Sequence, residues 1–165
     1  MPHTLHLPPL QALPSLSEAL DAIDRAESSA ARVRVAADQL HAFGLDRVVI
    51  TLRDASLNAT VSVTLGEIDA DRPSSYALQP LPGAVWRRRL TQLDRFKCGD
   101  LYVLDGTDPW VAREFFGTEE SPRAFPEQWV ETDLVLGLMR GAEQELLGIV
   151  KLAAPRSRTR PNESL

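Results

Sequence analysis

The sequence has 165 residues, a formal net charge of −5 and a hydrophobic fraction of 44%. This length suits one domain with a sizeable buried core. The acidic balance argues against nucleic-acid binding, which depends on a basic surface. A single cysteine, Cys98, excludes an intramolecular disulfide and a cysteine-based zinc site. We find neither a signal peptide nor the apolar run of ~20 residues that a membrane-spanning helix needs, so we expect no membrane association and a cytoplasmic location.

The N-terminal third predicts a flexible lead-in followed by one long helix. Residues 1–14 hold four of the twelve prolines and show no periodicity, which is typical of a loose terminus. Apolar residues then recur at steps of three and four up to Gly44, which predicts one continuous helix capped by Ser15 or Ser17. Its apolar face contains Leu16, Leu20, Ile23, Ala26, Ala30, Val33, Ala37, Leu40 and Phe43.

Part of this face forms a narrow seam that is close to a heptad pattern. Such a seam suits pairing between the helices of two copies of the chain. The alternative is that the seam packs on the sheet, and both roles are compatible. The predicted dimer seam consists of Leu16, Leu20, Ile23, Ala30 and Val33.

The rest of the chain predicts mainly strands. The expected elements are strands at 47–54 and 59–66, a helix after Pro82, a strand at 101–104, a long irregular loop from 105 to about 132, and a closing pair of strands within 134–155. Paired strands with helices between them favour an α+β fold with an antiparallel sheet. Gly137 and Gly148 would leave space on the closing strands for a ligand or a neighbouring element. Residues 156–165 are expected to form a polar, solvated tail.

Residues suited to catalysis or metal binding are sparse. No histidine lies near a glycine-flanked serine, so nucleophilic hydrolysis is not expected. Asp100, Asp105 and Asp108 could offer oxygen ligands to a cation, but turn formation explains them more simply. Cys98 is best interpreted as a small residue at a strand entrance. We therefore expect no enzyme and no metal site, and the sequence identifies no cofactor.

Eight of the ten aromatic residues lie between Trp86 and Trp129. Aromatic side chains commonly line pockets for small organic ligands. The alternative is that they hold the loops onto the sheet. We interpret Arg87, Arg88, Arg89 and Arg95 as a solvated helix face, and the alternative is that one of them reaches an anionic ligand. The candidate ligand-binding residues are Trp86, Phe96, Tyr102, Trp110 and Trp129.

Three segments together resemble GAF domains, small-molecule sensor modules of many bacterial signalling proteins. The segments are HAFGLDRVVITLRD, WRRRLTQLDRFKCGDLYVLDGTDPW and TDLVLGLMRGAEQELLGIVKLAAPRSRTRP. Their order and spacing cover about residues 16–161. The chain departs from the family in its 140–145 turn, which lacks an Asp-Gly pair, and in the C-terminal helix, which is not found. No motif typical of cyclic-nucleotide binding is present.

The resemblance implies a GAF/PAS-like antiparallel sheet of about five to six strands with helices on both sides and the N-terminal helix on one face. It implies a GAF-like sensory domain over 15–155, within a fragment of a longer polypeptide. The expected function is non-catalytic binding of an unidentified small molecule, with signalling through helix-mediated dimerisation. The expected partners are a second copy of the chain and an output domain such as that of a histidine kinase or a nucleotide cyclase. The alternative is a ligand-free dimerisation or protein-interaction module.

Overall fold

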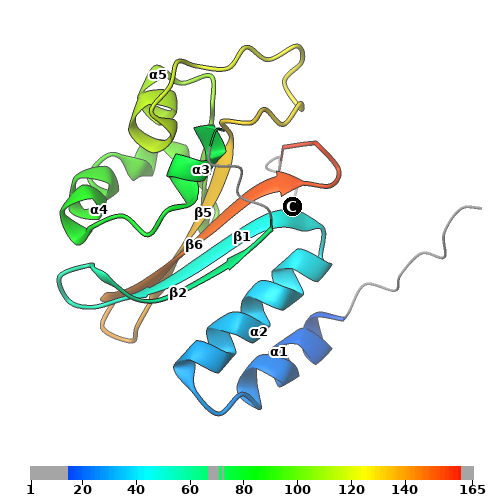
Figure 1. The fold of residues 1–165 in the computed structure, drawn as a ribbon, viewed down its shortest axis with the longest axis vertical. Helices are drawn as coiled ribbons and strands as arrows, with labels where there is room; N and C mark the ends of the chain where they lie inside the picture. The colour runs from blue at the N-terminus through cyan, green and yellow to red at the C-terminus, as the bar shows by residue number, and fades with distance from the viewer. Residues whose placement is uncertain (1–14, 67–70, 72, 161–165) are drawn as a thin grey trace, which may run out of the picture.

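The structure is a computed structural model that describes residues 15–66, 71 and 73–160. Its centre is a six-stranded antiparallel sheet in the order β2-β1-β6-β5-β4-β3 (Figure 1). The predicted α+β class with an antiparallel sheet is therefore confirmed. The expected lead-in, with His3 and His6, lies outside the described residues. In the described part of the chain, the helices are too short or too polar to cross a membrane.

Two helices, rather than the predicted continuous one, precede the sheet. They are α1 (Leu16–Asp24) and α2 (Ser29–Ala42). Ser15 and Glu18 form a reciprocal capping box at the start of α1. The prediction of one helix is wrong because the Ser28 side chain accepts a hydrogen bond from the Ala31 N–H and begins a new helix. Serine favours such caps over helix interiors.

The two predicted strand pairs are both present. The first consists of β1 (Leu45–Arg53) and β2 (Ala59–Leu65), and the closing pair of β5 (Leu134–Arg140) and β6 (Leu146–Pro155). Gly44, with φ +104°, separates α2 from β1 as expected. The remaining elements are α3 (Pro73–Leu78), α4 (Gly83–Leu90), η1 (Leu93–Phe96), β3 (Lys97–Cys98), β4 (Leu101–Leu104), α5 (Pro109–Val111) and η2 (Ala112–Phe116).

Helices cover both faces of the sheet, as Figure 1 shows, with α1 and α2 on one side and α3, α4 and α5 on the other. Successive side chains of a strand point to opposite faces. On β1, Val48 and Ile50 therefore pack with Val33 and Ala37 of α2, whereas Val49 belongs to the core on the opposite face. The expected packing of the N-terminal helical segment on one face is thus observed for α2.

The segment from 105 to 132 is more regular than predicted. Pro109 opens α5, and the Asp108 side chain accepts hydrogen bonds from the N–H groups of Trp110 and Val111. The chain continues through η2 to Gly117, whose φ of +65° ends the helical stretch. This short helical unit was missed because its apolar residues extend over too few turns to show a clear period.

The start of the predicted tail, residues 156–160, is tied to the loop before β5. The Trp129 N–H donates to the Arg158 carbonyl oxygen, and the Arg160 N–H donates to the Glu127 carbonyl oxygen, each at 2.9 Å. A solvated tail therefore does not describe these residues. Residues 156–160 are held instead against the loop before β5.

Candidate ligand-binding site

Four of the candidate aromatic residues lie in the layer between the sheet and helices α4 to η2. Trp86 of α4 is fully buried and meets Phe115 edge-on, with ring centroids 6.2 Å apart. Trp110 also meets Phe115 edge-on at 5.5 Å and stacks on Phe96 at 5.7 Å. Tyr102 belongs to the same hydrophobic core. These rings form packed core, so any recognition of a ligand here must come from the polar groups among them.

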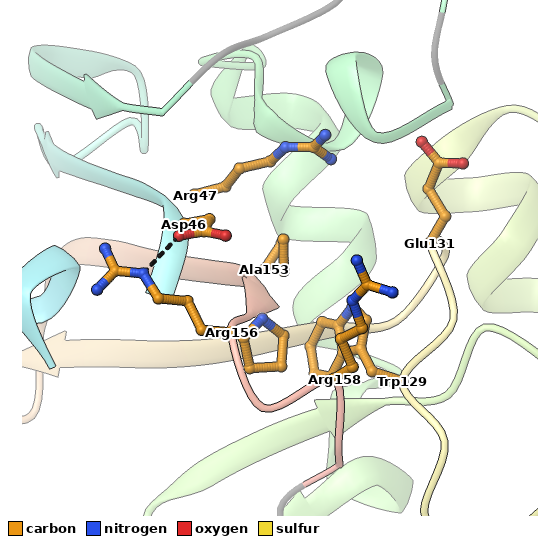
Figure 2. Close-up of a pocket in the computed structure, with 9 residues that line it drawn as sticks. Asp46, Arg47, Trp129, Glu131, Ala153, Arg156 and Arg158 are labelled. Carbon is orange, nitrogen blue, oxygen red and sulfur yellow. Dashed lines mark hydrogen bonds and ion pairs between the residues drawn. The ribbon is translucent and has the colours of Figure 1, made fainter. Parts of the chain in front are cut away.

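Trp129 is half-buried against the same core and also borders a basic hollow at one end of the sheet. This hollow, of about 490 Å³, is also lined by Arg47, Arg156 and Arg158. Figure 2 shows Arg156 turned toward Asp46, with which it forms an ion pair at 2.8 Å. A second hollow of about 290 Å³, with mostly apolar walls, adjoins Trp129. Trp129 is therefore only partly exposed, and it borders both hollows.

Three cationic side chains gather around Trp86 inside the protein. The guanidinium carbons of Arg53 and Arg89 lie 5.2 and 5.5 Å from the indole centroid, and the Lys151 Nζ lies 5.4 Å from it. Only 6% of Arg53 is exposed, and Arg89 and Lys151 are fully buried. Fully buried arginine and lysine are rare unless they are paired. We name these three residues, with Trp86, the buried cationic cluster.

Arg53 reaches the cluster from the end of β1, where it shares a face of the sheet with Thr51. Its Nη1 donates to the carbonyl oxygens of Leu57 and Leu81, at 2.5 and 3.0 Å. These bonds connect the β1–β2 turn to the segment before α4. Its Nη2 is buried and has no hydrogen-bond partner among the described residues. Burial lowers the pKa of Arg53 to about 10, an effect that the charge of Asp54 opposes.

Arg89 enters from α4, three residues after Trp86 and therefore on the same side of the helix. Its Nη2 donates to the carbonyl oxygen of Glu114, and its Nε lies 3.5 Å from the carboxylate of that residue. Glu114 also pairs with Arg88, which is exposed. The Arg89 Nη1 has no partner among the described residues. Burial lowers the pKa of Arg89, and Glu114 offsets part of that effect.

Lys151 lies in the middle of β6, between Val49 of β1 and Leu136 of β5. Its Nζ donates to the carbonyl oxygens of Ala77 and Gln79, at 2.8 and 2.7 Å, at the C-terminal end of α3. Carbonyl groups at a helix C-terminus attract a cation. Burial first, and then the neighbouring charges of Arg89 and Arg53, lower the pKa of Lys151 to about 7.

Asp105 and Asp108, which could offer oxygen ligands to a cation, have structural roles instead. In the described part of the chain, no three histidine, cysteine or acidic side chains are grouped to hold a metal ion. Asp105 accepts from the Thr107 N–H, and Asp108 caps α5, in agreement with turn formation. Cys98 is half-buried on the short strand β3.

A buried carboxylate holds the loop before β5 in place. Asp133 is fully buried and accepts hydrogen bonds from the Gly106 N–H and from Arg123 Nη2, both at 2.8 Å. Arg123 also pairs with Asp105 at 2.8 Å, and Arg160 pairs with Asp105 at 3.2 Å. This network joins the loop, the start of the 105–132 segment and the chain after β6.

The structure divides the predicted dimer seam between two environments. Leu16 and Leu20 on α1 are 69% and 53% exposed. Ile23 is half-buried and Ala30 is exposed. Val33 on α2 is buried against the sheet. A surface for a second copy could therefore use the α1 end of the seam, whereas Val33 performs the alternative role of packing on the sheet.

Sequence reasoning missed the buried cations. The interpretation of the arginines near α4 as a solvated face holds for Arg87 and Arg88 and is wrong for Arg89. Three signals could have found the cluster. Lys151 interrupts an apolar strand, and Arg89 follows Trp86 at helical spacing. Arg53 continues the alternation of Val49 on β1, which places it on the inner face.

The chain matches no known family model, no curated protein sequence and no solved structure.

Proposed function

We propose that this chain is a non-catalytic sensory or regulatory domain of the GAF type, which binds a small molecule and signals through helix-mediated dimerisation. The observation that carries this proposal is the buried cationic cluster beneath α3 and α4. Buried polar groups in proteins are nearly always hydrogen-bonded, and exceptions point to function or to an absent partner. A layer that served only to cover the sheet would be more stable with apolar side chains there.

The position of β1 supports a route from this layer to α1 and α2. Thr51 and Arg53 point toward the side of the sheet that α3 and α4 cover, whereas Val48 and Ile50 pack against α2. A ligand that draws Arg53 away from its present carbonyl partners would displace β1. Because the core is closely packed, that displacement changes the packing of α2 on the opposite face.

The exposed leucines of α1 support the dimerisation part of the proposal. Leu16 and Leu20 lie one helical turn apart, which places both on one side of α1. Apolar side chains that gather on an exposed helix face are a common feature of interfaces between protein chains. In a longer polypeptide, an output domain such as that of a histidine kinase or a nucleotide cyclase would receive the signal.

A ligand-free dimerisation or protein-interaction module is the second candidate. The packing around Trp86 and Phe115 favours it, because both rings are fully buried against protein atoms. In that case the cations would serve only to fasten α3, α4 and the β1–β2 turn to the sheet.

Native mass spectrometry of the purified protein tests the two candidates. A dimer that carries an additional small mass supports the sensory function, and a bare dimer supports the second candidate. Leu20→Glu should convert the dimer to a monomer, whereas Leu147→Glu, at an exposed leucine of β6, should leave it intact. A wild-type protein that stays monomeric at high concentration would contradict the sensory function and the dimerisation form of the second candidate.

A further inference from the structure

The buried cationic cluster has an excess of hydrogen-bond donors. A guanidinium group offers five N–H donors and an ammonium group three, and neither accepts. Arg53 Nη2, Arg89 Nη1 and the Trp86 Nε1 are all buried and lack a partner among the described residues. Three buried donors within one cluster are therefore left without an acceptor by the described residues.

The cluster also has an excess of positive charge. Glu114 contacts Arg89, and its carboxylate is shared with the exposed Arg88. Arg53 is influenced by Asp54, which is itself exposed. Lys151 is bonded to two neutral carbonyl groups. Like charges out of contact with water repel strongly, so an anion near the three cations would lower the free energy of the folded state.

A purely structural role explains one terminal nitrogen of each buried arginine but not the other. Arg53 fastens the turn through Nη1, Arg89 fastens η2 through Nη2, and each then presents a second terminal nitrogen that no described group uses. Charged forks of this kind match the oxygen atoms of carboxylate and phosphate groups. The adjacent indole N–H adds a third donor of suitable chemistry.

We infer that Arg53, Arg89 and Lys151, beside Trp86, bind the oxyanion group of a small molecule. This inference rests on the proposed sensory function and names its class of ligand. The oxyanion accepts hydrogen bonds from the free guanidinium nitrogens and attracts the Lys151 ammonium. In doing so it competes with the carbonyl oxygens of Ala77 and Gln79, and binding is thereby linked to the position of α3.

The first test uses the wild-type protein with three probes, namely nitrate, inorganic phosphate and malonate, each compared with sodium chloride at equal ionic strength. We expect one probe to raise the melting temperature in a saturable manner and to shift the indole N–H signal of Trp86 in the NMR spectrum. Trp86→Phe assigns that signal. Preference for phosphate or malonate distinguishes a phosphorylated ligand from a carboxylic acid. Failure of all three probes to move the Trp86 signal would overturn the inference.

Matched variants locate the binding. Arg53→Lys and Arg89→Lys keep the positive charge but remove the unused guanidinium donors. Each should reduce the affinity for the probe roughly tenfold or more. Arg87→Lys, on the exposed side of α4, should leave binding unchanged. If binding is equal in all three variants, or if Arg158→Met abolishes it, the anion occupies the basic hollow at Trp129 and the inference is wrong.

The outcomes also separate this inference from the proposed function. A neutral molecule found in native mass spectra of the dimer would support the sensory function and exclude the oxyanion site. An anion that binds at Trp86 but changes neither the dimerisation constant nor the hydrogen exchange of α1 and α2 would support the site and contradict the sensory function.

Discussion

The protonation of Lys151 predicts an unusual dependence of stability on pH. Its pKa is lowered in the folded protein to about 7 from an ordinary value of 10.5. Above pH 7 the folded chain therefore loses this proton while the unfolded chain keeps it. Stability rises with pH wherever the unfolded state binds more protons, so the folded state gains stability through this window. At 1.36 kcal/mol per pKa unit, integration between pH 7 and pH 9 gives a gain of about 2 kcal/mol.

Urea denaturation of the wild type and of Lys151→Met, at a series of pH values, measures this gain. The difference in free energy of unfolding between them should change by about 2 kcal/mol over these two pH units, because methionine does not titrate. Lys97, the other lysine of the chain, is exposed, and Lys97→Met should show the wild-type dependence. Burial lowers the pKa of Arg53 only to about 10, so Arg53 keeps most of its charge up to pH 9 and contributes little to the change. Parallel curves for wild type and Lys151→Met would refute the reasoning.

Four further substitutions test the packing and the buried network by urea denaturation. Phe115→Ala removes a fully buried ring and should lower the free energy of unfolding by about 3–5 kcal/mol. A decrease below about 1 kcal/mol would contradict the packing of this layer. Asp133→Asn removes a buried charge paired with Arg123 and should cost about 2–4 kcal/mol, whereas an unchanged stability would show that the ion pair adds nothing. Gly148→Ala would place a methyl group 2.6 Å from the Thr51 carbonyl oxygen and should cost about 1–3 kcal/mol. At Gly137 the added methyl group makes ordinary contacts at 3.5 Å, so Gly137→Ala should cost less, and the reverse order would contradict the sheet register.

The sheet could be predicted from the sequence because alternation of side chains along a strand is a local property. Residues 59–66 show it directly, residues 47–54 form a β-branched run typical of a strand, and the structure places β1 and β2 within two residues of those bounds. The helix after Pro82 was equally clear, since Val85, Trp86 and Leu90 recur at helical spacing. Such patterns need only the chemistry of near neighbours in the chain.

The features that the sequence did not reveal depend on competition or on distant contacts. The break between α1 and α2 arises where helix propensity competes with the capping tendency of Ser28, and a pattern of apolar residues does not weigh these against each other. In the sequence Arg89 looks like its exposed neighbours Arg87 and Arg88. Tertiary packing places its guanidinium carbon 4.1 Å from the centroid of the Phe115 ring. The buried charge of Lys151 likewise depends on carbonyl groups more than seventy positions earlier in the chain.

The arrangement of β1 and β6 makes the two covered faces of the sheet mechanically dependent. These strands are neighbours, neither is an edge strand, and their residues alternate between the two cores. Lys151 faces α3, whereas the adjacent residues Val150 and Leu152 pack toward α2. A change in the bonds of Lys151 therefore cannot be confined to one layer, because the same stretch of backbone carries both sets of side chains. The position of Arg53 and Lys151 on two interior strands, and not on an edge strand, is what would allow an event beneath α3 to alter the surface of α1 and α2.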